Sequence, residues 1–250
     1  AKMIRRDFLG LMGATLVGSL AQADELKHPD IWLRDDQKGV FESVIKKLEM
    51  VERTVGYANF NLISFDETLK IAKSFPKIGA FTPAEIAYIE EVFYTDPVIY
   101  GFYGKRTIEN LTDTINEKDV IKIEGSGHYV YRGHSQELLE RLMKDIGKTL
   151  ILTSGVRSTM KQLSLHLEKI KSENGNITVA SRSLVPPAYS YHSVGDFDVG
   201  KKGWGHQNFT ANFARTEEFW NLQKLSYVSM RYTIGNGDGV RFEPWHVKIV

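Results

Sequence analysis

Hydrophobic residues recur at helical spacing through the first part of the chain, from about residue 24 to about residue 118. One predicted helix has a continuous apolar face, made by Phe41, Val44, Ile45, Leu48 and Val51. A second helix is predicted over 65–74, where Ser64 suits the N-cap position. A third is predicted to begin at Thr82-Pro83-Ala84-Glu85, an N-cap residue followed by a first-turn proline and an acidic residue. We find no motif that carries chemistry in this helical N-terminal region.

The second half of the chain alternates short apolar strands with helices. Strands are predicted over 120–123, 128–131 and 149–153, and a helix with one apolar face over 135–146. Another helix is predicted to begin after Ser158.

Three more strands are predicted after the Pro186-Pro187 break. They cover 196–199, 227–234 and 246–250, with a glycine-rich turn at 235–239 between the last two. The order of elements lacks the regularity of βαβ units. The predicted fold class is therefore α+β, with a small, mostly antiparallel sheet flanked by helices and preceded by the helical N-terminal region.

Composition narrows the functional classes. The 250 residues are 42% hydrophobic and 11% aromatic, which supports a packed core and excludes disordered and collagen-like proteins. The 32 basic and 31 acidic residues are spread along the chain, so we expect no nucleic-acid partner. Because there is no cysteine, disulfides and thiolate ligands are excluded. Any bound metal must be held by His, Asp or Glu.

The first 23 residues have the pattern of an export signal. Arg5-Arg6-Asp7-Phe8-Leu9 matches a twin-arginine motif, an apolar run over 8–20 follows, and Ala21-Gln22-Ala23 is a typical cleavage site. The apolar run is shorter than the about 20 residues that cross a bilayer, so we expect no permanent membrane anchor. We expect a periplasmic or otherwise exported protein whose mature form starts near Asp24. The alternative is the amphipathic N-terminal helix of a cytosolic protein.

Three short segments hold the residues suited to chemistry. They are Ser154-Gly155-Val156-Arg157-Ser158, the stretch 190–198 with His192, and Glu243-Pro244-Trp245-His246. Two histidines, several carboxylates and an arginine are what a metal site with a general base and an anion-binding group requires. Strand alternation also favours a shared site, because Asp196 and Asp198 would face away from the core.

These segments resemble the zinc D-alanyl-D-alanine carboxypeptidases of the M15 peptidase family, the VanY-like group. The similarity covers residues 154–250 and rests on S-G-x-R-S, S-x-H-x-x-G and E-P-W-H in that order. The resemblance implies that zinc is bound by His192, Asp198 and His246. It implies that Glu243 is the catalytic base and that Arg157 stabilises an oxygen of the substrate or transition state. The residues expected to contact substrate are Ser190, Tyr191, Gln162 and Trp245.

One position departs from the family pattern. The family usually has its aspartate seven residues after the first histidine, where this chain has Val199. Asp198 lies six residues after His192, between apolar neighbours at the start of a predicted strand. We therefore favour Asp198 as the ligand, with Asp196 as the alternative. His128 and His134 could form a second metal pair, but with no carboxylate beside them we expect plain surface residues.

The function that the resemblance implies is removal of a C-terminal D-alanine from peptidoglycan stem peptides by an exported Zn²⁺ enzyme. An L,D-carboxypeptidase or a murein endopeptidase on the same scaffold is the alternative within the enzyme class. A non-catalytic cell-wall binding protein is the alternative from another class, and Glu243 disfavours it because a structural zinc needs no base. The predicted organisation is an export signal over 1–23, the helical region over 24–118 and the peptidase domain over 119–250.

Overall fold

The computed structural model describes residues 29–249. The predicted export signal and the expected mature start near Asp24 lie outside these residues. The first half of the described chain forms four helices: α1 (Lys38–Val55), α2 (Tyr57–Phe60), α3 (Phe65–Ser74) and α4 (Pro83–Tyr94). No helix within residues 29–249 has the length and apolar character needed to span a membrane.

The helix starts predicted in this region are confirmed. The Ser64 hydroxyl accepts a hydrogen bond from the Glu67 backbone N–H, and the Glu67 carboxylate accepts one from the Ser64 N–H. Thr82 and Glu85 form the same capping box at α4, with Pro83 in the first turn. Each pair satisfies backbone donors that a helix start would leave without partners.

The second half contains the strands and four further helices. In chain order these are β1 (Val120–Ile123), β2 (His128–Tyr131), α5 (His134–Ile146), β3 (Leu150–Ser154), α6 (Thr159–Ser172), α7 (Ile177–Ser181), β4 (Phe197–Lys201), α8 (Glu217–Gln223) and β5 (His246–Val247). Short 3-10 turns connect several of them. The Ser158 hydroxyl accepts from the Lys161 N–H and caps α6 as predicted.

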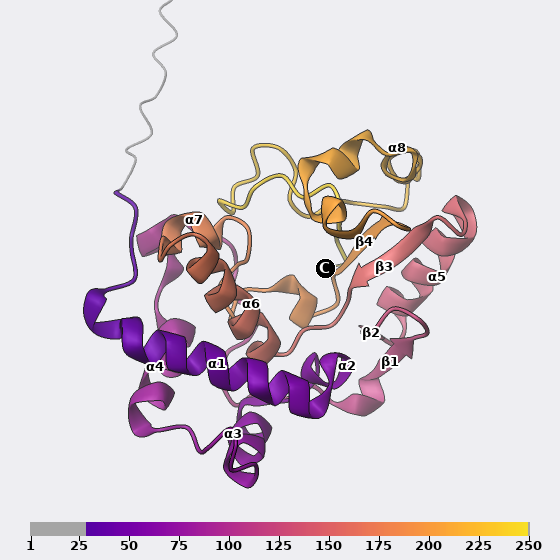
Figure 1. Ribbon diagram of the computed structural model, residues 1–250. Coiled ribbons are helices and arrows are strands. Elements are labelled where there is room, and N and C mark those ends of the chain that lie inside the picture. The colour runs from indigo at the N-terminus through magenta and orange to yellow at the C-terminus, as the bar shows by residue number, and fades with distance from the viewer. Residues whose placement is uncertain (1–28, 250) are drawn as a thin grey trace, which may run out of the picture.

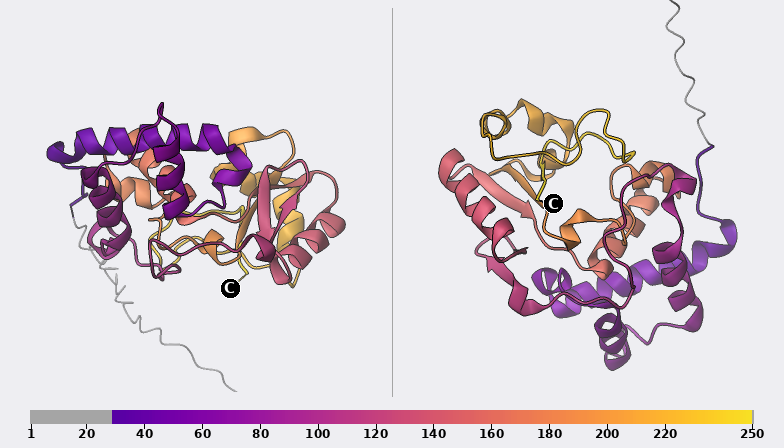
Figure 2. Two further views of the ribbon diagram at one scale, coloured as in Figure 1. Left: turned by 90° about the horizontal axis from the view of Figure 1, so that it is seen from below. Right: turned by 180° about the vertical axis from the view of Figure 1, so that it is seen from behind.

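Two small antiparallel sheets confirm the α+β class. One consists of β1 and β2, and the other has the order β3-β4-β5. Seen from behind, the three-stranded sheet has α5 along its outer side (Figure 2). A register shift between Leu152 and Ser154 places Ser154 opposite Asp198. Ser154 and Asp198 are therefore placed together at the functional site by two adjacent strands.

The prediction of a strand over 227–234 is wrong. This segment runs beside β5, where the Arg231 N–H donates to the His246 carbonyl, but it forms only one isolated bridge, between Met230 and Val247. Its start is a turn, because the Val228 N–H bonds back to the Leu225 carbonyl. A segment with alternating apolar residues thus lies beside a strand without forming a continuous ladder of hydrogen bonds with it.

Two main core clusters stabilise the fold. The first contains Leu48 of α1, Ile89 of α4 and Leu163 of α6, so helices of both halves share it. Figure 1 shows α1 lying alongside α6. The second lies between α5, α8 and the three-stranded sheet, and it includes Phe197 and Val247. This arrangement covers one face of the sheet and leaves the other for the functional site.

Candidate metal and peptidase site

Three buried side chains meet on the open face of the three-stranded sheet. His192 lies in the 3-10 turn Tyr191–Ser193, Asp198 on β4 and His246 on β5. Asp198 and His246 are paired residues in the sheet register, which places their side chains together on one face. One ligand atom from each residue lies within 4.8 Å of the others.

The facing atoms are two ring nitrogens and a carboxylate. His192 Nε2 lies 3.3 Å from Asp198 Oδ2, and His246 Nδ1 lies 3.3 Å from Asp198 Oδ1. Asp198 Oδ1 is buried and has no hydrogen-bond partner among the described residues. Buried carboxylate oxygens are normally satisfied. A set of two imidazoles and one carboxylate around such an atom suits zinc.

The second nitrogen of each imidazole is held from outside the cluster. His192 Nδ1 lies 2.8 Å from the Gly155 carbonyl oxygen, which can only accept, so Nδ1 carries the proton. His246 Nε2 lies 3.0 Å from Asp196 Oδ2. Outer partners of this kind orient metal-binding histidines and direct their remaining nitrogen inward. Gly155 is required here, because a Cβ would lie 1.9 Å from the Tyr129 carbonyl oxygen.

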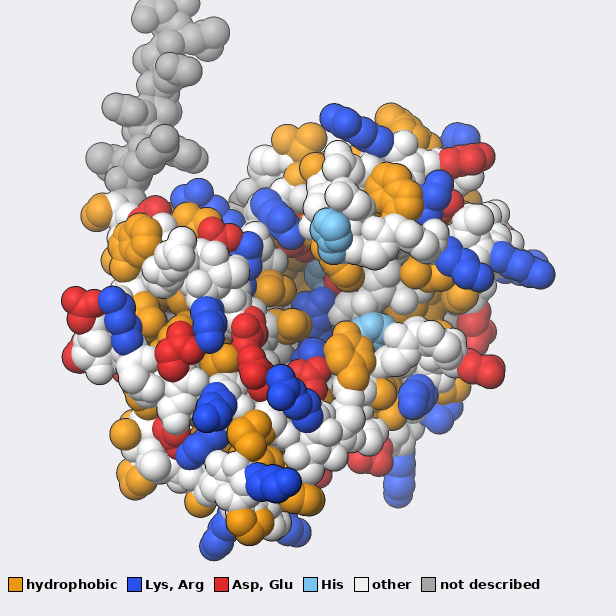
Figure 3. All heavy atoms as spheres, in the orientation of Figure 1, with side chains coloured by type: hydrophobic (Ala, Val, Ile, Leu, Met, Phe, Trp, Pro, Cys, Tyr) orange, Lys and Arg blue, Asp and Glu red, His pale blue; other side chains and the backbone are white. Residues whose placement is uncertain are grey.

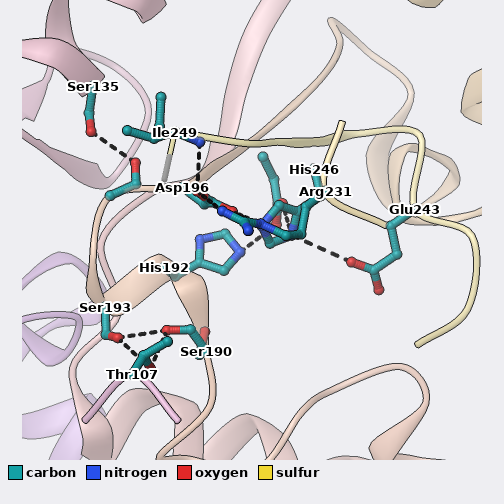
Figure 4. A network of polar contacts seen from close by, with 12 residues as sticks. Thr107, Ser135, Ser190, His192, Ser193, Asp196, Arg231, Glu243, His246 and Ile249 are labelled. Atoms are coloured by element: carbon teal, nitrogen blue, oxygen red, sulfur yellow. Dashed lines mark hydrogen bonds and ion pairs between the residues drawn. The ribbon is translucent and has the colours of Figure 1, made fainter. Parts of the chain in front are cut away.

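Asp196 lies behind His246 instead of within the cluster. Figure 4 shows its carboxylate between Arg231, His246 and the backbone of Ile249. Arg231 Nε and Nη2 donate to it at 2.7 and 3.0 Å, and the Ile249 N–H donates at 2.7 Å. Burial opposes ionisation of Asp196, but the hydrogen bonds from His246 and Arg231 lower its pKa. Both oxygens of Asp196 are therefore engaged away from the cluster.

Glu243 stands at the edge of the cluster. Its Oε2 lies 3.5 Å from His246 Nδ1, and its backbone N–H donates to the Tyr232 carbonyl. The side chain is buried, and burial raises its pKa. Its other oxygen lies 3.7 Å from Arg241 Nε. Glu243 is thus a carboxylate next to the proposed ligands.

The charges of the cluster set the protonation of its imidazoles. Burial lowers the pKa of His192 to about 4, and the positive charge of Arg157 acts in the same direction. Burial also opposes a charge on His246, but hydrogen bonds to Asp196 and Glu243 raise its pKa to about 9. His192 is therefore neutral at pH 7. The surroundings of His246 favour its cation, whose Nδ1 proton a metal bound there would displace.

Arg157 is fixed by three side chains. Its Nε donates to Ser154 Oγ at 2.8 Å, its Nη1 to Gln162 Oε1 at 3.3 Å and its Nη2 to Asp198 Oδ2 at 2.9 Å. Gln162 is itself anchored by a bond to the Val185 carbonyl. A guanidinium has five N–H donors, so both terminal nitrogens keep one for another acceptor. Arg157 is buried yet able to bind an anion.

A cavity of about 360 Å³ opens onto these residues. Figure 3 shows the hollow at the centre of this face, with basic side chains inside it. The predicted site residues that line it are Arg157, Gln162, Ser190, His192, Asp198, Glu243, Trp245 and His246. Tyr191 lies outside the cavity, where the Arg231 guanidinium stacks 3.7 Å from its ring centroid.

The part of the chain that contains this site is similar to a known protein family. Residues 131–250 match the family model described as VanY, D-alanyl-D-alanine carboxypeptidase. This match covers just under half of the chain, and we call residues 131–250 the VanY domain after the model. The match confirms the resemblance found in the sequence and supports a peptidase as the function class. No curated protein matches the chain.

Several solved structures are similar to the chain. The LdcB LD-carboxypeptidase shares 18% identity over 54% of this chain and 70% of its own, with a TM-score of 0.46. A mutant of the D,D-pentapeptidase VanY, from a VanB-type resistance cassette and in complex with Zn(II), shares 20% identity over 52% and 76%, with a TM-score of 0.40. The D,D-dipeptidase VanXYg, in complex with a D-Ala-D-Ala phosphinate analogue, shares 17% identity over 54% and 60%, with a TM-score of 0.43.

Several residues that line the cavity, some in the VanY domain and some outside it, were not predicted from the sequence. They include Tyr57, Asn61, Lys161, Lys169, Phe209, Tyr232 and Arg241. A signal existed for Lys161 and Lys169, because they lie eight residues apart, about two turns, in the helix predicted after Ser158. The sequence carries no comparable signal for Tyr57, which comes from α2.

The prediction that His128 is a surface residue is wrong. Its side chain is buried in β2, where alternate residues point inward, and Nδ1 has no hydrogen-bond partner within residues 29–249. Its ring makes an edge contact with Tyr57 at 5.5 Å between centroids. Burial lowers the pKa of His128 to about 4. His134, at the start of α5, is exposed as expected.

Proposed function

We propose that this protein is a zinc carboxypeptidase that removes a C-terminal D-alanine from peptidoglycan stem peptides. The observation that carries the proposal is the buried cluster of His192, Asp198 and His246, with Glu243 and Arg157 beside it, inside a VanY domain. As part of the proposal, residues 1–23 direct export by the twin-arginine route, and the domain that follows residue 118 acts on the cell wall from outside the cytoplasm.

The residues fit a zinc ion by their chemistry. The donors of a three-ligand site are two imidazoles with outward-held protons and a carboxylate, one oxygen of which has no hydrogen-bond partner within residues 29–249. Zinc in such a site acts as a Lewis acid and makes water more acidic. Asp196 and the Gly155 carbonyl would keep the imidazoles in the required orientation.

Glu243 is proposed as the group that moves protons. Its Oε2 faces the cluster from 3.5 Å and would accept a proton from the attacking water. The same oxygen would then donate that proton to the nitrogen of the departing amino acid. Glu243 is buried beside the ligands, so its side chain has little contact with bulk water.

Arg157 is proposed to bind negative charge on the substrate. Its free N–H donors point from a guanidinium fixed by Ser154, Gln162 and Asp198, so it would bind the terminal carboxylate or a developing oxyanion without reorganisation. Ser190 and Trp245 would complete the wall against which the peptide lies.

Defined muropeptides incubated with the zinc-loaded protein test the proposal, with products identified by mass spectrometry. We expect release of one D-alanine from a pentapeptide stem and no reaction in the presence of a chelator. Release from a tetrapeptide alone would indicate the L,D-carboxypeptidase instead. Equal cleavage of C-terminally amidated or internal bonds would indicate an endopeptidase. Binding without any cleavage would indicate a cell-wall binding protein.

A further inference from the structure

One part of the cavity wall comes from outside the VanY domain. Tyr57 begins α2, Asn61 follows α2 directly, and both line the cavity together with Arg157 and Lys161. The family match starts at residue 131, so neither Tyr57 nor Asn61 belongs to it. The helical N-terminal region therefore contributes to the same cavity as the candidate ligands.

The ring of Tyr57 is held in place but remains accessible. The Lys161 ammonium lies 4.6 Å from the ring centroid, and His128 makes an edge contact on another side. The ring also lies next to Gly127, where a Cβ would be in ordinary van der Waals contact with Tyr57 Cδ1 at 3.4 Å. Tyr57 is nevertheless 52% exposed. A fixed aromatic surface of this kind binds a ligand at little cost in side-chain entropy.

Two contacts fix α1 and α2 relative to Arg157. The Ser158 N–H donates to the Asn61 carbonyl at 2.7 Å, and Ser158 directly follows Arg157. Lys161 Nζ donates to Glu52 Oε1 at 2.9 Å, which joins α1 to the first turn of α6. Figure 1 shows α2 next to the start of α6. Tyr57 therefore keeps a set position with respect to the proposed anion-binding group.

Building on the proposed function, we propose that Tyr57 binds the part of the substrate peptide that lies on the N-terminal side of the cleaved bond. A carboxypeptidase releases one residue on the C-terminal side, so a longer peptide extends only in the other direction. The cavity of about 360 Å³ falls within the range of about 300–1,000 Å³ that encloses drug-sized ligands, which exceed a single alanine. The ring of Tyr57 would pack on the peptide, and the Tyr57 hydroxyl would form a hydrogen bond with a peptide amide or carbonyl.

Steady-state kinetics on peptides of increasing length test this role. The substrates share a D-alanyl-D-alanine end and range from the dipeptide to a pentapeptide. Tyr57→Ala should lower kcat/KM about tenfold for the pentapeptide, mainly through KM, and less than about twofold for the dipeptide. Tyr57→Phe should lie between Tyr57→Ala and the wild type. The control is Tyr103→Ala, because Tyr103 is exposed to a similar extent, 54%, but does not line the cavity.

Loss of the same size at every peptide length, or no loss in Tyr57→Ala, would overturn the proposal. Calorimetric titration of the pentapeptide into each variant separates this result from failure of the proposed function. If the wild type binds the pentapeptide without cleaving it, the proposed function fails, and the role of Tyr57 stands only if Tyr57→Ala weakens that binding. If the wild type neither binds nor cleaves it, both proposals fail.

Discussion

Two aspartates two positions apart have different surroundings, and this difference can be tested residue by residue. Asp198 faces both histidines, and one of its oxygens has no hydrogen-bond partner in the part of the chain that the structure describes. Both oxygens of Asp196 are engaged by Arg231, His246 and Ile249. The register of β4 against β5 decides which of them meets the cluster. The sequence favoured Asp198 from its apolar neighbours but left Asp196 open.

We expect Asp198→Asn to abolish stoichiometric zinc binding, since it removes a charged ligand from a set of three. Asp196→Asn should keep the site but weaken zinc binding by about 10- to 100-fold, because it acts only through the orientation of His246. Metal content after dialysis against a graded chelator series measures both effects. If Asp196→Asn loses zinc while Asp198→Asn keeps it, the ligand assignment is wrong.

Glu243→Gln should retain zinc and lose turnover. The amide preserves the size of the side chain but cannot accept the proton, and positioned general acid–base groups contribute about 100- to 10,000-fold to rate. Measuring kcat and zinc content on the same preparation checks the prediction. A variant with near wild-type kcat would remove Glu243 from the mechanism.

Arg157→Lys should keep zinc and the fold but reduce kcat/KM by about 100- to 1,000-fold. A lysine cannot contact Ser154, Gln162 and Asp198 at once while donating to a substrate oxygen. Kinetics with a pentapeptide and with its C-terminally amidated form measure the effect. Full activity of the lysine variant would show that a forked donor is not needed.

At the scale of elements, the sequence predicted local features better than it predicted pairing between distant segments. Both capping boxes and the Ser158 cap are visible in the sequence because they involve residues within one turn. The strand predicted over 227–234 failed because a ladder depends on a partner, and β5 provides only two strand residues. The burial of His128 was missed because its contact with Tyr57 joins elements far apart in sequence.

Helix α6 contains a buried histidine that makes stability depend on pH. His166 is 1% exposed, lies 2.7 Å through Nδ1 from the Leu184 carbonyl, and has a pKa lowered by burial from 6.5 to about 4. His166 therefore binds a proton near pH 6.5 in the unfolded chain but only near pH 4 in the folded chain. The contribution of His166 to stability is present above pH 6.5 and is lost as the pH falls toward 4.

We expect His166→Asn to lose less stability than the wild type between pH 7 and pH 4.5, by roughly 2–3 kcal/mol. The asparagine amide can still donate to the Leu184 carbonyl but does not titrate. Urea unfolding at the two pH values, with chelator present so that zinc does not contribute, measures the difference. Parallel stability losses in the two proteins would contradict this explanation.

At the scale of the whole molecule, the helical N-terminal region and the VanY domain share one core and one cavity. Leu48 and Leu163 lie in the same cluster, and Glu52 pairs with Lys161 across more than a hundred residues. Three ordered motifs in the sequence predicted a candidate site in the VanY domain, but they assigned no role to the residues before 119. Periodicity shows that a helix has an apolar face without showing which helix covers it.

Crystallography of the zinc-loaded protein, with anomalous data collected on both sides of the zinc absorption edge, would show where the metal binds. We expect one strong anomalous peak per molecule, in contact with His192 Nε2, a carboxylate oxygen of Asp198 and His246 Nδ1. Glu243 should lie beside the peak without contacting it. A peak at Asp196, a peak elsewhere in the molecule, or no peak at full zinc loading would contradict the proposed zinc site.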